Sequence, residues 1–149
     1  MNQFDTELES RVWQRVRGEA TSQPTQSLQS LTAAELSEAA AALMLSRQLQ
    51  GKEKAILRKM YEEDHAHALC LKGMHYFTFD QPLSIRHIPP APETPVIALR
   101  KAYGRKLRAL REYESRTGDP EYGAIFRSLA LQERQHCRLI LELVGILKK

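Results

Sequence analysis

The segments EEDHAHALCL (residues 62–71) and LALQERQHCRLILELV (residues 129–144) decide the fold, because each places a carboxylate three residues before a histidine. The two pairs are Asp64 with His67 and Glu133 with His136. Side chains at positions i and i+3 lie on one face of a helix, so each pair can reach a common point inside a bundle. Two such pairs in similar settings predict a metal site between helices.

The composition is that of one globular domain. The chain has 149 residues, of which 42% are hydrophobic and 27% are charged, and these values are typical of a soluble protein. Its longest apolar run, residues 39–45, is too short to span a bilayer. The acidic start MNQFDTELESR lacks the features of a secretory signal, so we expect a cytoplasmic protein. Cys70 and Cys137 form no CxxC motif and are expected to be reduced core residues.

Residues 1–30 are predicted to be an N-terminal arm with a polar linker, and residues 31–149 to be a helical bundle. The arm has an amphipathic pattern over residues 4–17, whose apolar side carries Phe4, Leu8, Val12 and Val16. The following segment GEATSQPTQS (residues 18–27) is polar and offers no core. We therefore expect a short helical arm that packs on the domain or on a neighbouring protein.

Four longer helices are predicted over residues 31–50, 52–75, 95–116 and 120–149. Thr32 is expected to be the N-cap of the first helix, and Glu35 to complete a capping box. The connections within the first two and within the last two helices are short, so each pair should form an antiparallel hairpin. The proline-rich segment 76–94 can run back along the whole bundle, since its 19 residues reach roughly 60 Å when extended. Two hairpins joined by one long crossover favour a ferritin-like arrangement over a simple up-and-down bundle.

Helical phase decides which carboxylate–histidine pair of the second helix points inward. The apolar stripe of this helix consists of Ile56, Leu57, Met60, Leu71 and Met74. Asp64 and His67 fall within that stripe, whereas Glu62 and His65, which have the same spacing, point away from it. The sequence therefore predicts Asp64 and His67 as the site residues of this helix.

Counting residues from the turn at Gly51 gives the level of these side chains on the first helix. Asp64 lies 13 residues after this glycine, and its level on the first helix falls at Glu35 to Glu38. The alanines between residues 39 and 42 allow the two helices to approach closely. Glu35 is therefore a candidate ligand, and Glu38 is an alternative from the same helix.

The same count gives no carboxylate on the third helix. Glu133 lies some 15 residues after the turn near Gly118, and the matching level falls at Tyr103, Gly104 or Leu107. If the two hairpins are equivalent, the position that matches Glu35 is Gly104. The predicted site therefore lacks one carboxylate.

The two halves of the chain resemble the two hairpins of a rubrerythrin-like protein of the ferritin-like superfamily. The resemblance covers about residues 31–147 and rests on residues 35–73 and 98–145. It implies that each hairpin supplies a Glu from its first helix and Glu-x-x-His from its second, and that together they bind two irons. The positions that match these ligands are Glu35, with Glu38 as an alternative, Asp64, His67, Glu133 and His136.

The chain departs from this pattern in three respects. Asp64 stands in place of a glutamate, and Gly104 stands where a bridging carboxylate is expected. The rubredoxin module of rubrerythrins is absent, since two cysteines cannot form a four-thiolate iron site. One iron, two irons or an empty site are all compatible with these residues, and manganese is an alternative to iron.

Three functions of different classes are compatible with the sequence. The first, a di-iron oxidoreductase that reacts with peroxide or dioxygen, is what the resemblance implies, together with a homodimer and a redox donor protein as partners. The second is a non-catalytic module that has lost its metals. The third is protection of nucleic acid by a basic face of the third helix, although a solvated face is the favoured interpretation. Six bases crowd into this helix, with Lys101, Arg105 and Arg108 on one face: Arg100, Lys101, Arg105, Lys106, Arg108 and Arg111. No membrane partner is expected.

Overall fold

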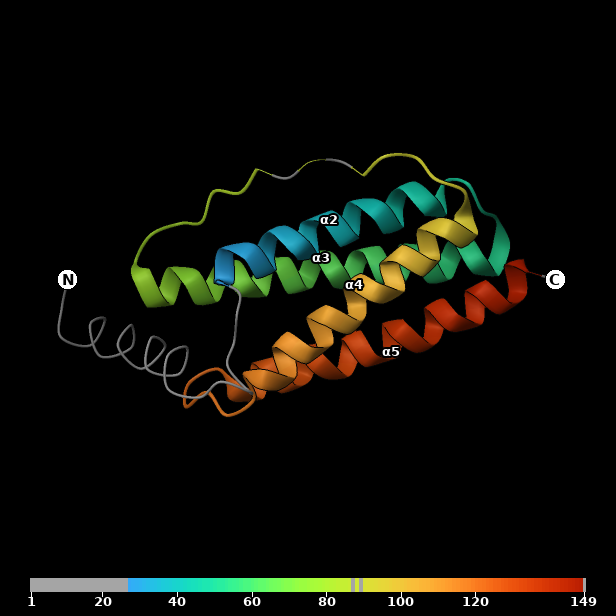
Figure 1. Ribbon diagram of the computed structural model, residues 1–149. Helices are drawn as coiled ribbons and strands as arrows, with labels where there is room; N and C mark the ends of the chain where they lie inside the picture. Colours follow the sequence, from blue (N-terminus) through green and yellow to red (C-terminus); the bar gives the residue numbers. More distant parts are fainter. Residues whose placement is uncertain (1–26, 87, 89, 149) are drawn as a thin grey trace.

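The computed structural model describes residues 27–86, 88 and 90–148, and this part of the chain is all-α, with four helices and no strand (Figure 1). The helices are α2 (Leu28–Ser46), α3 (Gly51–Phe79), α4 (Pro95–Ser115) and α5 (Gly123–Leu147). The prediction of an all-helical bundle is confirmed. The arm predicted over residues 4–17 lies outside the described residues.

The helices pair as two antiparallel hairpins, as predicted from the short connections. Helix α2 packs on α3 and α4 packs on α5, while α2 contacts α4 and α3 contacts α5 between the hairpins. The crossover, of which residues 80–86, 88 and 90–94 are described, passes along the outside of the bundle from the end of α3 to the start of α4 (Figure 1). The helices pack more closely within each hairpin than between the hairpins.

The start of α2 differs from the predicted capping box. Ser27 is the N-cap, and its Oγ accepts a hydrogen bond from the backbone N–H of Ser30 at 3.1 Å. Thr32 lies inside the helix, where its Oγ1 donates to the carbonyl oxygen of Leu28 at 2.6 Å. Glu35 is therefore not a capping residue, and its side chain is buried between the helices.

The boundaries of α3 also differ from the predicted ones. The helix begins at Gly51, whose φ of +62° suits a residue without a Cβ atom. It continues past the predicted end near His75 to Phe79, and Asp80 ends it in the left-handed conformation with its N–H donating to the carbonyl of Tyr76. Helix α2 ends earlier than expected, at Ser46.

The core consists of two apolar clusters with a layer of buried polar residues between them. The cluster near the start of α2 contains Leu31, Leu71, Met74, Leu110, Tyr113, Phe126, Leu129 and Ala130. The cluster near the start of α3 contains Leu45, Leu57, Met60, Leu99, Ile140 and Leu143. On every helix at least one buried polar or charged residue comes between these clusters in the sequence. We call the six residues Glu35, Asp64, His67, Lys106, Glu133 and His136 the polar layer.

Two further predictions concern residues that the structure describes. None of the described helices combines the length and apolar composition needed to cross a membrane. Cys70 and Cys137 are both free cysteines, with Cys137 buried and Cys70 partly buried, as expected for cysteines that pack against the core.

Removing a core side chain next to the polar layer should destabilise the bundle far more than removing a surface one. Leu71 is completely buried, whereas Leu69 on the same helix is 56% exposed. Leu71→Ala should lower the free energy of unfolding by about 2–5 kcal/mol, because it leaves a cavity. Leu69→Ala should change it by less than about 0.5 kcal/mol. Urea unfolding followed by circular dichroism measures both, and equal losses would contradict the described core.

Candidate metal centre

All four helices contribute side chains to the polar layer. Helix α2 supplies Glu35, α3 supplies Asp64 and His67, α4 supplies Lys106, and α5 supplies Glu133 and His136. None of the six is more than 4% exposed. The structure thus brings together five of the residues predicted from the sequence, and it adds a lysine that was not predicted.

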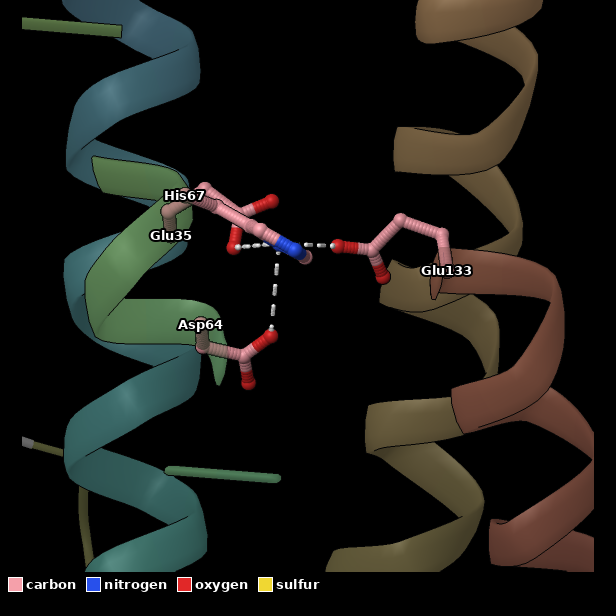
Figure 2. Close-up of side chains that lie close together, drawn as sticks. All are labelled: Glu35, Asp64, His67 and Glu133. Atoms are coloured by element: carbon pink, nitrogen blue, oxygen red, sulfur yellow. Dashed lines mark ion pairs between the residues drawn. The ribbon is translucent and has the colours of Figure 1, made fainter. Parts of the chain in front are cut away.

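His67 lies at the centre of a group of three carboxylates, as Figure 2 shows. Its Nδ1 atom lies 3.3 Å from Glu133 Oε1, 3.4 Å from Glu35 Oε2 and 3.9 Å from Asp64 Oδ1. One ligand atom from each of these four residues lies within 4.8 Å of the other three. We call Glu35, Asp64, His67 and Glu133 the four-donor group. Ligands at about 2 Å from a common ion lie about 3–4 Å apart, so small side-chain adjustments would close this group around a metal.

Several atoms of the four-donor group are buried without a hydrogen bond. They are Glu35 Oε2, Asp64 Oδ2, His67 Nδ1 and Glu133 Oε1. Buried polar atoms in folded proteins nearly always have a partner, because leaving one without any is costly. Glu35 Oε2, His67 Nδ1 and Glu133 Oε1 come from three helices and lie together, since Nδ1 is within 3.4 Å of both oxygens. The Asp64 oxygen nearest to them is Oδ1, 3.9 Å from Nδ1. The arrangement is therefore suited to a cation that all four can share.

Two residues that the sequence did not single out hold this group in place. The Nε2 atom of His67 forms a hydrogen bond with Oε1 of Gln132, and because a carbonyl oxygen accepts, Nε2 must carry the proton. In the neutral ring, Nδ1 then has its lone pair free for a metal. The hydroxyl of Tyr113 donates to Glu35 Oε1 at 2.6 Å, which leaves Oε2 facing the group. Neither residue carries a motif that the sequence could have revealed.

Lys106 lies where the sequence led us to expect Gly104. Its Nζ atom lies 2.5 Å from Asp64 Oδ1, 3.0 Å from His136 Nδ1 and 3.5 Å from Glu133 Oε2. The predicted level, Tyr103 to Leu107, includes Lys106, but Gly104 was chosen within it because the two hairpins were taken as equivalent. Glu133 is ten residues after Gly123, and ten residues before Ser115 is position 105, next to Lys106. Gly104 itself is partly exposed.

His136 is in the polar layer but outside the four-donor group. Its Nδ1 accepts from Lys106, and its Nε2 lies 3.5 Å from Glu63 Oε1. The ring stacks on His67 with centroids 6.0 Å apart. His136 therefore contacts the lysine side of the layer.

Glu38, the alternative ligand of the first helix, points to a different place. It is buried and forms an ion pair with Arg105 of α4. Both residues line a cavity of about 260 Å³ between α2 and α4, which the crossover covers with Pro90 and Ala91. The cavity reaches Met60, one helical turn before Asp64, but no polar-layer residue lines it. Glu62 and His65 are both exposed, as helical phase predicted.

Burial and neighbouring charges set the protonation of the layer. Burial, together with the negative charge of Glu133, raises the pKa of Glu35 to about 8. Burial alone would lower the pKa of His67, but contacts with the carboxylates of Glu133 and Glu35 outweigh it and raise the pKa to about 10. Burial would raise the pKa of Glu133, but the charge of Lys106 outweighs it and lowers the pKa to about 2. A metal would therefore replace protons on Glu35 and His67.

Comparisons with known protein families, characterised proteins and solved structures found no match to this chain. The chemistry of the centre must therefore be inferred from its own side chains.

The metal-free protein should lose stability as the pH rises. Between 4.5 and about 8 the folded protein holds the Glu35 proton that the unfolded chain releases, so rising pH favours unfolding. His67 acts in the same direction between 6.5 and about 10. Glu133 has the opposite effect, because its pKa is lowered on folding. The stability that it contributes is lost as the pH falls from 4.5 towards about 2. Urea midpoints measured across this range with a chelator present should therefore decrease on the alkaline side.

Glu35→Gln should flatten the decrease in the urea midpoint between pH 4.5 and about 8, because it removes the carboxyl group that holds a proton in the folded protein. Glu62→Gln, at an exposed position of α3, should leave the profile unchanged. An alkaline slope that persists in full in Glu35→Gln would contradict the role given to Glu35.

Proposed function

We propose that this chain is a rubrerythrin-like metal protein of the ferritin-like class that binds iron, or alternatively manganese, through the four-donor group. The observation that carries the proposal is the convergence of four buried ligand side chains, in which Glu35 Oε2, His67 Nδ1 and Glu133 Oε1 lack hydrogen bonds. The connectivity supports it, because two hairpins joined by a long crossover are typical of ferritin-like bundles.

The donor set favours iron or manganese among the common metals. Three carboxylates and one imidazole provide hard oxygen ligands with a single nitrogen, without a thiolate. Sites of this kind suit Fe²⁺ or Mn²⁺, whereas structural zinc sites are dominated by cysteine and histidine and calcium sites by oxygen alone.

The residues around the donors have separate roles in this proposal. Tyr113 orients Glu35, Gln132 orients His67, and the apolar clusters on both sides keep bulk water away. Bound iron would supply one-electron chemistry towards peroxide or dioxygen. An external redox donor and a second copy of the chain remain the proposed partners, and a cytoplasmic location is the one in which both free cysteines would stay reduced.

A metal-free structural module is the second candidate, and one observation favours it. Lys106 contacts two of the three carboxylates of the layer, and His67 contacts all three. A bundle with these partners can balance much of its buried charge without a metal.

Protection of nucleic acid has less support than the sequence suggested. Of the three bases predicted to share a face on α4, Arg105 pairs with Glu38 and Lys101 pairs with Glu93. Lys106, another of the six bases, is buried. Fewer of these charges are therefore available to phosphates.

Metal analysis of two matched double variants tests the proposal. Wild-type protein reconstituted with Fe²⁺ or Mn²⁺ and passed through a desalting column should retain metal. Asp64→Asn with His67→Gln should lose most of it, because two of the four donors are removed. Glu62→Gln with His65→Gln, which has the same spacing on the exposed face of the same helix, should retain the wild-type amount. If wild type retains no more metal than the buried double variant, the metal-free module is correct.

The oxidoreductase part of the proposal has its own test. When wild type is loaded with Fe²⁺ without oxygen, addition of peroxide should oxidise the iron rapidly, as followed by ferric absorbance in a stopped-flow instrument. The exposed double variant should react at the same rate. Iron that stays ferrous in wild type while remaining bound would show a metal site without this activity.

A further inference from the structure

We infer that the ammonium group of Lys106 serves as a permanent second cation of the centre, so that the protein binds a single metal ion where a two-metal bundle binds two. This inference rests on the proposed metal binding and specifies its stoichiometry. Its basis is the way in which the polar layer divides into two halves.

The first half of the layer is the four-donor group around His67 Nδ1, in which Nδ1, Glu35 Oε2 and Glu133 Oε1 lack hydrogen bonds. The second half surrounds Lys106 Nζ, which lies 2.5 Å from Asp64 Oδ1, 3.0 Å from His136 Nδ1 and 3.5 Å from Glu133 Oε2. Two carboxylate oxygens and an imidazole nitrogen are themselves a metal-ligand set. The ammonium thus occupies the position that a second metal would need.

Glu133 connects the two halves. Its Oε1 lies 3.3 Å from His67 Nδ1, and its Oε2 lies 3.5 Å from Lys106 Nζ. A carboxylate that places one oxygen in each half is arranged to bridge two cations. In this chain the second cation is a side chain, so the bridge joins a metal position to an ammonium.

The charges of the layer agree with a single divalent ion. Three carboxylates and one ammonium give −3 + 1 = −2 when both histidines are neutral, which one divalent cation balances. A carboxylate at position 106 would give −4, which two divalent cations balance. The charge of Lys106 also repels a second metal close to His136 Nδ1.

The ammonium donates hydrogen bonds to Asp64 Oδ1 and His136 Nδ1, and Glu133 Oε2 lies at ion-pair distance from it. A lysine Nζ has three donors and no acceptor, and Asp64, His136 and Glu133 each place one acceptor near it. His136, which was predicted as a metal ligand, is therefore a ligand of the ammonium in this chain.

Lys106→Glu tests the inference, with Gly104→Glu as the matched control. Both substitutions put a glutamate on α4, but position 106 is buried in the layer, whereas a Cβ atom at position 104 meets only the side chain of Arg108, at 3.8 Å. Titration with Mn²⁺, followed by calorimetry and electron paramagnetic resonance, should give one ion per chain for wild type and for Gly104→Glu. Lys106→Glu should bind two ions, with the spectrum of a spin-coupled pair.

Lys106→Met decides the matter if Lys106→Glu does not fold, as judged by circular dichroism. Methionine removes the ammonium and leaves its three neighbours, so a second, weaker Mn²⁺ should bind. One ion in wild type and still one in the folded Lys106 variants would overturn the inference but leave the proposed metal binding intact. Two ions bound to wild type would also overturn the inference and leave the proposed metal binding intact. No ion in wild type would instead overturn the proposed function.

Discussion

The contact between the Lys106 ammonium and the carboxylates of Asp64 and Glu133 is the interaction on which the rest of the bundle depends. These groups come from three helices and lie at the same depth, where water cannot replace a missing partner. Removing one member of a buried ion pair leaves an uncompensated charge, and this typically costs about 3–5 kcal/mol. The apolar clusters on either side can form only when the helices are placed so that these charges meet.

The polar layer also fixes how the two hairpins align. Apolar side chains tolerate sliding along a helix, since one leucine can replace another at a contact. A lysine that needs Asp64 from α3 together with Glu133 and His136 from α5 has one suitable position. Buried polar contacts set register in some helical assemblies at a cost in stability. In this bundle they act where backbone packing between the hairpins is looser than within them.

Much of the candidate site could be predicted from the sequence, because helical phase is a local property. The inward direction of Asp64 and His67, and the outward direction of Glu62 and His65, follow from their spacing relative to apolar neighbours. Glu35 followed from counting residues on both sides of a tight turn. The same counting gave the correct range on α4, Tyr103 to Leu107, but not the residue. The two hairpins are not equivalent, since Glu35 precedes Asp64 by 29 residues and Lys106 precedes Glu133 by 27. Lys106 was counted as a surface base, since a buried lysine is recognisable only when its partners on other helices are known.

Two of the donors are oriented by hydrogen bonds from the opposite hairpin. Tyr113 of α4 fixes Glu35 of α2, and Gln132 of α5 fixes His67 of α3. A shift of one hairpin against the other would therefore turn both donors away from their common point. Ion capture and docking of the hairpins would then be a single equilibrium, and the affinity for a cation would report how well the two halves of the protein are assembled.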